Sequence, residues 1–192
     1  MASRQKPPGV STATARFTAV FAAILLVSCA AVIIAPFMAA ADGGSSAAPD
    51  DPATALIYDA GDLLCHQMPE RSFALAGVPM PLCQRCFAIL LGMTAFAAAA
   101  LFVRPPRGFF AFAGAFLPET RLPRLTIIAA ALLLVVPMAI DGTLQLATAY
   151  ESTPLVRAIT GFLYGMAQAG FLLAAIAGAD ALIERWRYRK DA

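Results

Sequence analysis

Three of the four cysteines and the only histidine of the chain occur together in one stretch, CHQMPERSFALAGVPMPLCQRCFAILLG, which runs from residue 65 to residue 92. Cys65 and His66 are adjacent, and Cys83 and Cys86 follow with C-x-x-C spacing. Residues of these types at such spacings can form a metal site, a thiol redox pair or a structural disulfide.

A zinc-type metal site is the interpretation that we favour. Two thiolates at C-x-x-C spacing can bind one tetrahedral ion, and Cys65 and His66 could complete the ligand set. Ligand pairs usually stand two or more residues apart, so one of these two neighbours could be a ligand while the other has a different role. Three protein ligands would leave an open position, where an activated water could attack an ester or an amide.

A thiol redox pair is the first alternative. The N-terminus of a helix stabilises the first thiolate of a C-x-x-C pair through its free N–H groups and its dipole, and Arg85 would add to this effect. A disulfide from Cys65 to Cys83 or Cys86 is the second alternative, and it would leave one thiol over.

A second set of polar residues lies further along the chain. Asp141 and Gln145 are four residues apart and share one face of an apolar helix. An ionisable residue inside a membrane span usually marks a functional site, so Asp141 is a candidate catalytic residue together with Arg71 and Arg157. The arginines, Arg85 included, could hold a phosphate or a carboxylate. The alternative for Asp141 is a structural ion pair with Arg157 or Arg85.

These residues must be positioned by a helical membrane protein. Hydrophobic residues make up 60% of the chain, charged residues 14%, and the mean hydropathy is +0.73. Four apolar segments are long enough to cross a bilayer, and none alternates as barrel strands do. They are Phe17–Ala40, Leu82–Val103, Leu125–Ala147 and Ala158–Ile183. We therefore predict an all-α fold, a single integral membrane bundle of four transmembrane helices.

The distribution of basic residues predicts the orientation of this bundle. Eleven of the fourteen Lys and Arg residues lie in the tail 1–16, in the connection between the second and third spans, and in the basic tail 184–192. The positive-inside rule then places both termini in the cytoplasm and the loop 41–81, with its Cys-His motif, outside. The apolar run of the first segment is longer than the roughly 7 to 15 residues of a signal-peptide core, so we expect a retained anchor.

The ordered motifs CHQMPERSF, PLCQRCFAILLG, DGTLQ and STPLVRAITGFLYG resemble those of the bacterial and archaeal membrane-protein family catalogued as domain of unknown function 2085. The resemblance covers roughly residues 58–170 and implies a small multi-spanning protein without an established activity. The positions that match the family are Cys65, His66, Gln67, Arg71, Ser72, Cys83, Arg85, Cys86, Asp141, Gly142, Gln145, Ser152, Arg157 and Gly161.

The sequence thus predicts a polar site at the extracytoplasmic mouth of the bundle, in the cell (inner) membrane. The expected metal ligands are Cys65, His66, Cys83 and Cys86, with zinc as the cofactor. The expected partners are the lipid bilayer and a lipid or lipid-linked substrate, with no nucleic acid. A thiol–disulfide oxidoreductase similar in architecture to quinone-linked disulfide oxidases, and a non-enzymatic membrane scaffold, are the alternatives.

Overall fold

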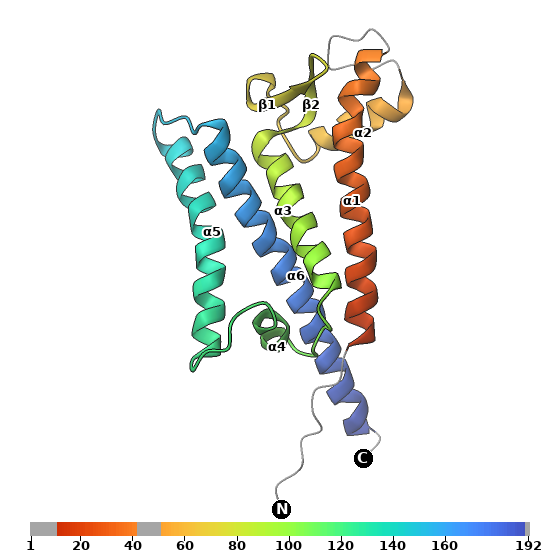
Figure 1. Ribbon diagram of the computed structural model, residues 1–192, viewed down its shortest axis with the longest axis vertical. Helices are drawn as coiled ribbons and strands as arrows, with labels where there is room; N and C mark the ends of the chain where they lie inside the picture. The colour runs from red at the N-terminus through yellow and green to blue at the C-terminus, as the bar shows by residue number, and fades with distance from the viewer. Residues whose placement is uncertain (1–10, 42–50, 191–192) are drawn as a thin grey trace, which may run out of the picture.

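The computed structural model describes residues 11–41 and 51–190 (Figure 1). Within this part of the chain, four helices are long and apolar enough to cross a membrane, and they are α1 (Thr12–Ala41), α3 (Gln84–Leu101), α5 (Pro123–Ala147) and α6 (Pro154–Lys190). The predicted helical class with four spans is confirmed. Residues 1–10, 42–50 and 191–192 lie outside the described residues, and with them most of the predicted tail 1–16 and part of the predicted loop 41–81.

Three helices differ clearly in length from the predicted spans. Helix α1 begins before residue 17 because Ser11 caps it, its Oγ accepting a hydrogen bond from the backbone N–H of Thr14 at 3.0 Å. Helix α6 begins earlier than predicted, with Pro154 in its first turn, and continues past residue 183 through a basic last turn. Helix α3 is shorter than predicted at both ends, and its first predicted residue, Leu82, lies in a strand.

The predicted loop 41–81 contains regular structure that the sequence analysis missed. It holds helix α2 (Pro52–Asp62), a single 3-10 turn (Pro69–Arg71), strand β1 (Ser72–Leu75) and most of strand β2 (Val78–Cys83). The two strands form an antiparallel hairpin. A further short helix, α4 (Phe109–Gly114), connects α3 to α5 at the other end of the bundle.

Helices α3 and α6 form the central pair of the bundle, with α1 packed on α3 and α5 packed on α6 (Figure 1). Helix α1 begins and helix α6 ends at one end of the bundle, whereas α2 and the hairpin lie at the opposite end, where α3 begins. We call this opposite end the cysteine end. Which end faces the cytoplasm stays a prediction from the distribution of basic residues.

The contact between α3 and α6 depends on glycines that have no room for a side chain. A Cβ at Gly165 of α6 would fall on the backbone carbonyl of Ile89 in α3, and a Cβ at Gly92 of α3 would fall on that of Phe162 in α6. The helices therefore approach backbone to backbone, and Gly161 and Gly165 form a small-xxx-small pattern that is typical of such contacts.

Gly165→Ala should therefore destabilise the fold by about 1–3 kcal/mol, because the methyl group cannot be accommodated without separating α3 from α6. Gly142→Ala is the matched control, because a Cβ at Gly142 of α5 meets nothing within 4 Å. This control should be neutral, or stabilising by up to about 1 kcal/mol through helix propensity. Thermal unfolding in detergent measures the stability of the two variants. Equal unfolding temperatures for the two variants would contradict the close approach.

Candidate metal centre at the cysteine end of the bundle

Cys65 is held by the turn that follows helix α2. Its backbone N–H donates to the carbonyl of Gly61 at 2.9 Å, so it continues the helical direction for one more turn. Gln67 then reverses the chain with a φ of +46°, and its amide donates to the carbonyl of Tyr58. The hydroxyl of Tyr58 in turn donates to the carbonyl of Pro79 in β2 at 2.8 Å. These bonds join the Cys65 turn to the strand that carries Cys83.

Cys83 is placed by the hairpin. Ala76 and Gly77 connect the strands with φ values of +51° and +81°, as in a two-residue turn with positive φ at both central positions. Strand β2 then leads directly into helix α3, whose N-cap is Cys83. Cys86 follows in the first turn of this helix. Only Gly77 marks this turn in the sequence, because alanine rarely adopts the positive φ that Ala76 has here.

The structure brings three of the four predicted metal ligands together. The Sγ atoms of Cys65, Cys83 and Cys86 all lie within 4.8 Å of one another. The backbone N–H of Cys83 donates to Cys65 Sγ at 3.3 Å. All four cysteines of the chain are among the described residues, and none forms a disulfide.

This grouping fits a thiolate-bound metal ion. A tetrahedral zinc ion with Zn–S bonds of about 2.3 Å requires sulfurs about 3.8 Å apart, so the sulfurs would contract by at most about 1 Å around it. Three thiolates are soft ligands of the kind that bind zinc. They would also leave a fourth position open.

Cys83 is the cysteine best suited to be a thiolate at neutral pH. A hydrogen bond from the thiol of Cys86 is the largest of several contacts that together lower the pKa of Cys83 from its ordinary value of 9.0 to about 5. The backbone N–H groups of Cys86 and Arg85 and the thiol of Cys65 act in the same direction, while partial burial opposes them. A thiolate is the form that binds metals and attacks disulfides.

His66 does not join this group. Among the described residues, the cluster of metal-ligating atoms at this end comprises the three cysteines alone. Neighbouring side chains in a turn leave the backbone in different directions, which explains how Cys65 enters the group without His66. The imidazole nevertheless lines the same pocket, and its role as a ligand stays a prediction.

The three cysteines line a pocket of about 340 Å³ at the cysteine end. Two apolar residues of the turn after α2, Leu64 and Met68, form part of its wall. Its other polar and charged lining residues are His66, Gln67, Arg71, Arg85, Gln145 and Arg157. The pocket therefore joins the Cys-His motif to the second set of polar residues that the sequence singled out.

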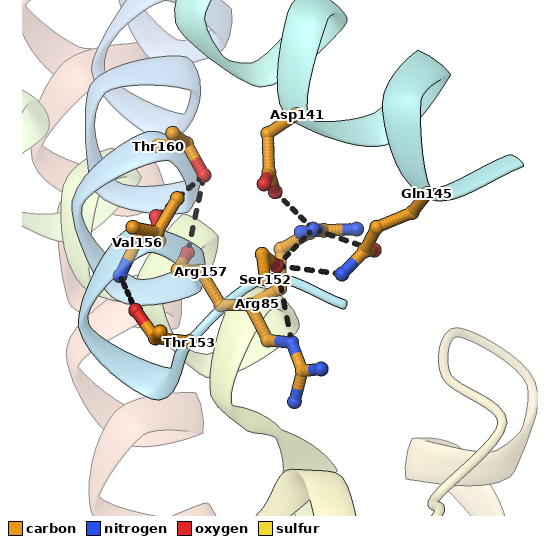
Figure 2. Close-up of polar contacts among 8 residues, drawn as sticks. All are labelled: Arg85, Asp141, Gln145, Ser152, Thr153, Val156, Arg157 and Thr160. Atoms are coloured by element: carbon orange, nitrogen blue, oxygen red, sulfur yellow. Dashed lines mark hydrogen bonds and ion pairs between the residues drawn. The ribbon is translucent and has the colours of Figure 1, made fainter. Parts of the chain in front are cut away.

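A polar cluster connects α5 to α3 beside this pocket (Figure 2). Arg85 forms an ion pair with Asp141, which is only 4% exposed. The same guanidinium nitrogen lies 3.0 Å from Gln145 Oε1 and 3.3 Å from Ser152 Oγ. Gln145 donates to Ser152 Oγ at 2.6 Å. Of the two partners that the sequence offered to Asp141, Arg85 makes the ion pair.

Arg157 approaches the same serine from α6. Its Nε donates to Ser152 Oγ at 3.3 Å, and the side chain makes no ion pair with any described residue. Figure 2 shows its guanidinium pointing away from Asp141. Ser152 thus links both arginines, a role that the sequence analysis did not assign.

The remaining candidates lie apart from the cluster. Arg71 pairs with Glu151 at 3.4 Å on the exposed surface of the cysteine end. Asp180 and Glu184 both pair with Arg107 near the opposite end of the bundle. Cys29 is buried beside Thr94 and does not belong to the cysteine group.

Comparison with known proteins agrees with the membrane architecture. The family described as "Predicted membrane protein (DUF2085)" matches residues 65–172, more than half of the chain, from Cys65 through the polar cluster and into α6. No solved structure matches the chain.

Two curated relatives are archaeal proteins whose names state no function. An uncharacterised protein of Methanocaldococcus jannaschii is 34% identical over 117 residues, which are 61% of this chain and 66% of that protein. An uncharacterised protein of Methanothermobacter thermautotrophicus is 36% identical over 103 residues, which are 54% of this chain and 78% of that protein. The family match spans both the cysteine group and the polar cluster beside it, and the chain belongs to the DUF2085 family of predicted membrane proteins.

Proposed function

We propose that this protein holds a zinc-type ion on Cys65, Cys83 and Cys86, and that the site acts on a lipid or lipid-linked substrate. The observation that carries the proposal is the approach of the three Sγ atoms to within 4.8 Å of one another. Two of these cysteines lie at the start of α3 and the third lies in a separate turn, so residues far apart in sequence are brought together at one point.

An open zinc site would supply Lewis acidity and would activate a water molecule for attack on an ester or amide. The residues of the chain supply the remaining parts of such a site. The lowered pKa of Cys83 favours its thiolate, the form that binds the ion. Asp141 holds the guanidinium of Arg85 in place, and this is the role that we assign to the carboxylate.

The position of the site favours a substrate that comes from the bilayer. The pocket lies where α3 begins, where α5 ends and where α6 begins, which is headgroup depth for helices that span a membrane. Leu64, which is 79% exposed, and Met68 give this end an apolar surface that acyl chains could contact. We place the protein in the cell (inner) membrane with the cysteine end outside, on the basis of the basic residues near the other end.

A thiol–disulfide oxidoreductase is the second candidate. It is favoured by the lowered pKa of Cys83, because an activated thiolate at a helix N-terminus is typical of C-x-x-C redox pairs. In that function Cys83 and Cys86 would cycle between two thiols and a disulfide, with two electrons passing to or from a dithiol or disulfide partner.

Metal content and thiol accessibility separate the two candidates. Protein purified without chelator should contain about one zinc-type ion per chain, and its thiols should be protected from alkylation until chelator or acid removes the ion. Mass spectrometry of the alkylated protein identifies the thiols that are released. Protein without metal whose Cys83–Cys86 disulfide forms and breaks near the potential of the compartment would instead establish the redox function.

A further inference from the structure

Arg157 carries a buried positive charge that has no acidic partner among the described residues. The residue is 7% exposed, and the one hydrogen bond of its guanidinium joins Nε to the neutral hydroxyl of Ser152 at 3.3 Å. Burial of a charge without a counter-ion is costly, so an arginine that served only to stabilise the fold would be expected to pair with a carboxylate.

The acidic residue of the neighbouring cluster is already engaged. Asp141 pairs with Arg85, so this carboxylate is not the partner of Arg157. Figure 2 shows the two terminal nitrogens of Arg157 directed away from Asp141. Within the described part of the chain, the Nε of Arg85 is buried and has no acceptor.

The three thiols do not use the free nitrogens of Arg157 either. No hydrogen bond between Arg157 and a cysteine sulfur is found among the described residues, although the arginine and the three cysteines line the same pocket. Arg157 lines the pocket together with the three cysteines, and its two terminal nitrogens are hydrogen-bond donors that no described residue uses.

We propose that this pocket binds a phosphate-class oxyanion, held bidentately by Nη1 and Nη2 of Arg157. The planar guanidinium offers two parallel N–H donors that match two oxygens of a phosphate group. Arg71, at the same pocket, supplies a second positive charge. Its ion pair with Glu151 is exposed and 3.4 Å long, so it is weak and can be exchanged for a contact with a ligand. Two arginines favour a doubly charged anion over a carboxylate.

This anion subsite would define the class of substrate for the proposed function. Its part in catalysis rests on that proposed function. A phosphate group on Arg157 would lie in the pocket that the three cysteines line, so the substrate would be a phosphate ester or a phosphate-bearing lipid. The phosphate could belong to a lipid, whose chains would contact Leu64 and Met68, or it could be free in solution. Binding itself needs no metal and can be measured separately.

The test measures the unfolding temperature of the purified full-length protein against increasing inorganic phosphate, at constant ionic strength, with chloride and acetate as reference anions. Phosphate should stabilise the wild-type protein in a saturable manner, since a ligand that binds only the folded state raises its stability. Acetate should have a much smaller effect. Equal stabilisation by acetate would contradict the assignment to a phosphate-class anion.

Variants of Arg157 provide the residue-level test. Arg157→Lys keeps the charge but loses the two-pronged donor geometry, so the dissociation constant for phosphate should rise roughly tenfold. Arg157→Gln should abolish the saturable effect. In chloride this variant should unfold at the wild-type temperature or above it, because a buried unpaired charge has been removed. Arg121→Gln, which changes an exposed arginine near the opposite end, is the control and should behave as wild type.

Two lipid ligands distinguish the sources of the phosphate. Dihexanoyl phosphatidic acid should bind more tightly than inorganic phosphate if the natural ligand is a lipid, and dihexanoyl phosphatidylcholine controls for the chains. Tighter binding of inorganic phosphate would indicate a soluble phosphate. Either result supports the anion subsite, provided that the binding depends on Arg157.

The outcomes separate this inference from the proposed function. Phosphate binding that depends on Arg157 in a protein without zinc would support the subsite and contradict the metal site. Stoichiometric zinc with no phosphate effect would do the reverse. Failure of both Arg157→Lys and Arg157→Gln to fold would show that Arg157 is a structural residue and would overturn the inference.

Discussion

Cys83→Ser should abolish stoichiometric zinc binding. Cys83 connects the other two sulfurs, because it is hydrogen bonded to both Cys65 and Cys86. Loss of a direct ligand should weaken zinc affinity by more than the roughly 10- to 100-fold that follows from mutation of outer-shell partners. Elemental analysis of the purified variant, together with competition against a chelator of known affinity, measures the change.

The other cysteines provide the comparison within the same chain. Cys65→Ser and Cys86→Ser should lower zinc content in the same way, whereas Cys29→Ser should not, because Cys29 lies beside Thr94 and outside the cysteine group. A protein in which all four variants retain the metal would exclude the three-cysteine site. If the wild-type protein and all four variants contain no metal, the redox pair is favoured.

His66→Ala makes a finer distinction. The imidazole lines the pocket but lies outside the cysteine group, so we expect this variant to retain the ion. Loss of zinc on His66→Ala would mean that the turn at Gln67 rearranges on metal binding and completes the four-ligand set that the sequence predicts.

The sequence predicted the spans well because apolar composition over about 20 residues is a strong local signal. It also selected Cys65, Cys83 and Cys86, because the C-x-x-C pair and the Cys-His pair can be recognised from neighbouring residues alone. What it could not decide was which neighbour of the Cys65–His66 pair enters the site, because this depends on the direction of each side chain in one turn. In the structure Cys65 joins the cysteine group, and the turn that carries it has a positive φ at Gln67 and a hydrogen bond from Gln67 to Tyr58.

Contacts between side chains far apart in the sequence were harder to predict than the helices themselves. Asp141 could be recognised as an unusual residue within an apolar span, but the choice between Arg85 and Arg157 depends on how α3, α5 and α6 pack. Ser152, which joins both arginines, precedes α6 in a short connection and carries no signal of its own beyond the family motif. The orientation of the bundle in the membrane stays a prediction, since it follows from charge distribution alone.

Asp141→Ala should be the most destabilising single change in the polar cluster. Helix α5 packs chiefly on α6, and its link to α3 at the cysteine end passes through the side chains of Asp141 and Gln145 to Arg85. Removal of the carboxylate leaves the partly buried guanidinium of Arg85 without its counter-charge. The breaking of a buried pair in this way typically costs about 3–5 kcal/mol.

Asp180→Ala is the matched control, because Asp180 is also an aspartate paired with an arginine. Its partner Arg107 keeps a second ion pair with Glu184 when Asp180 is lost, and all three side chains are partly exposed. The loss should therefore be no more than about 1 kcal/mol. Folded yield and unfolding temperature in detergent compare the two variants directly, and equal small effects would contradict the structural importance of Asp141.

The double variant Arg85→Met/Asp141→Leu tests the physical cause. If the penalty of Asp141→Ala arises from the uncompensated charge of Arg85, removal of both charges should recover most of the stability, since a buried ion pair can often be replaced by apolar residues of similar volume without loss. A double variant as unstable as Asp141→Ala would show instead that the hydrogen bonds of Arg85 to Gln145 and Ser152 hold α5 in place. In either case the zinc content of the double variant reports whether the cysteine group forms independently of the polar cluster.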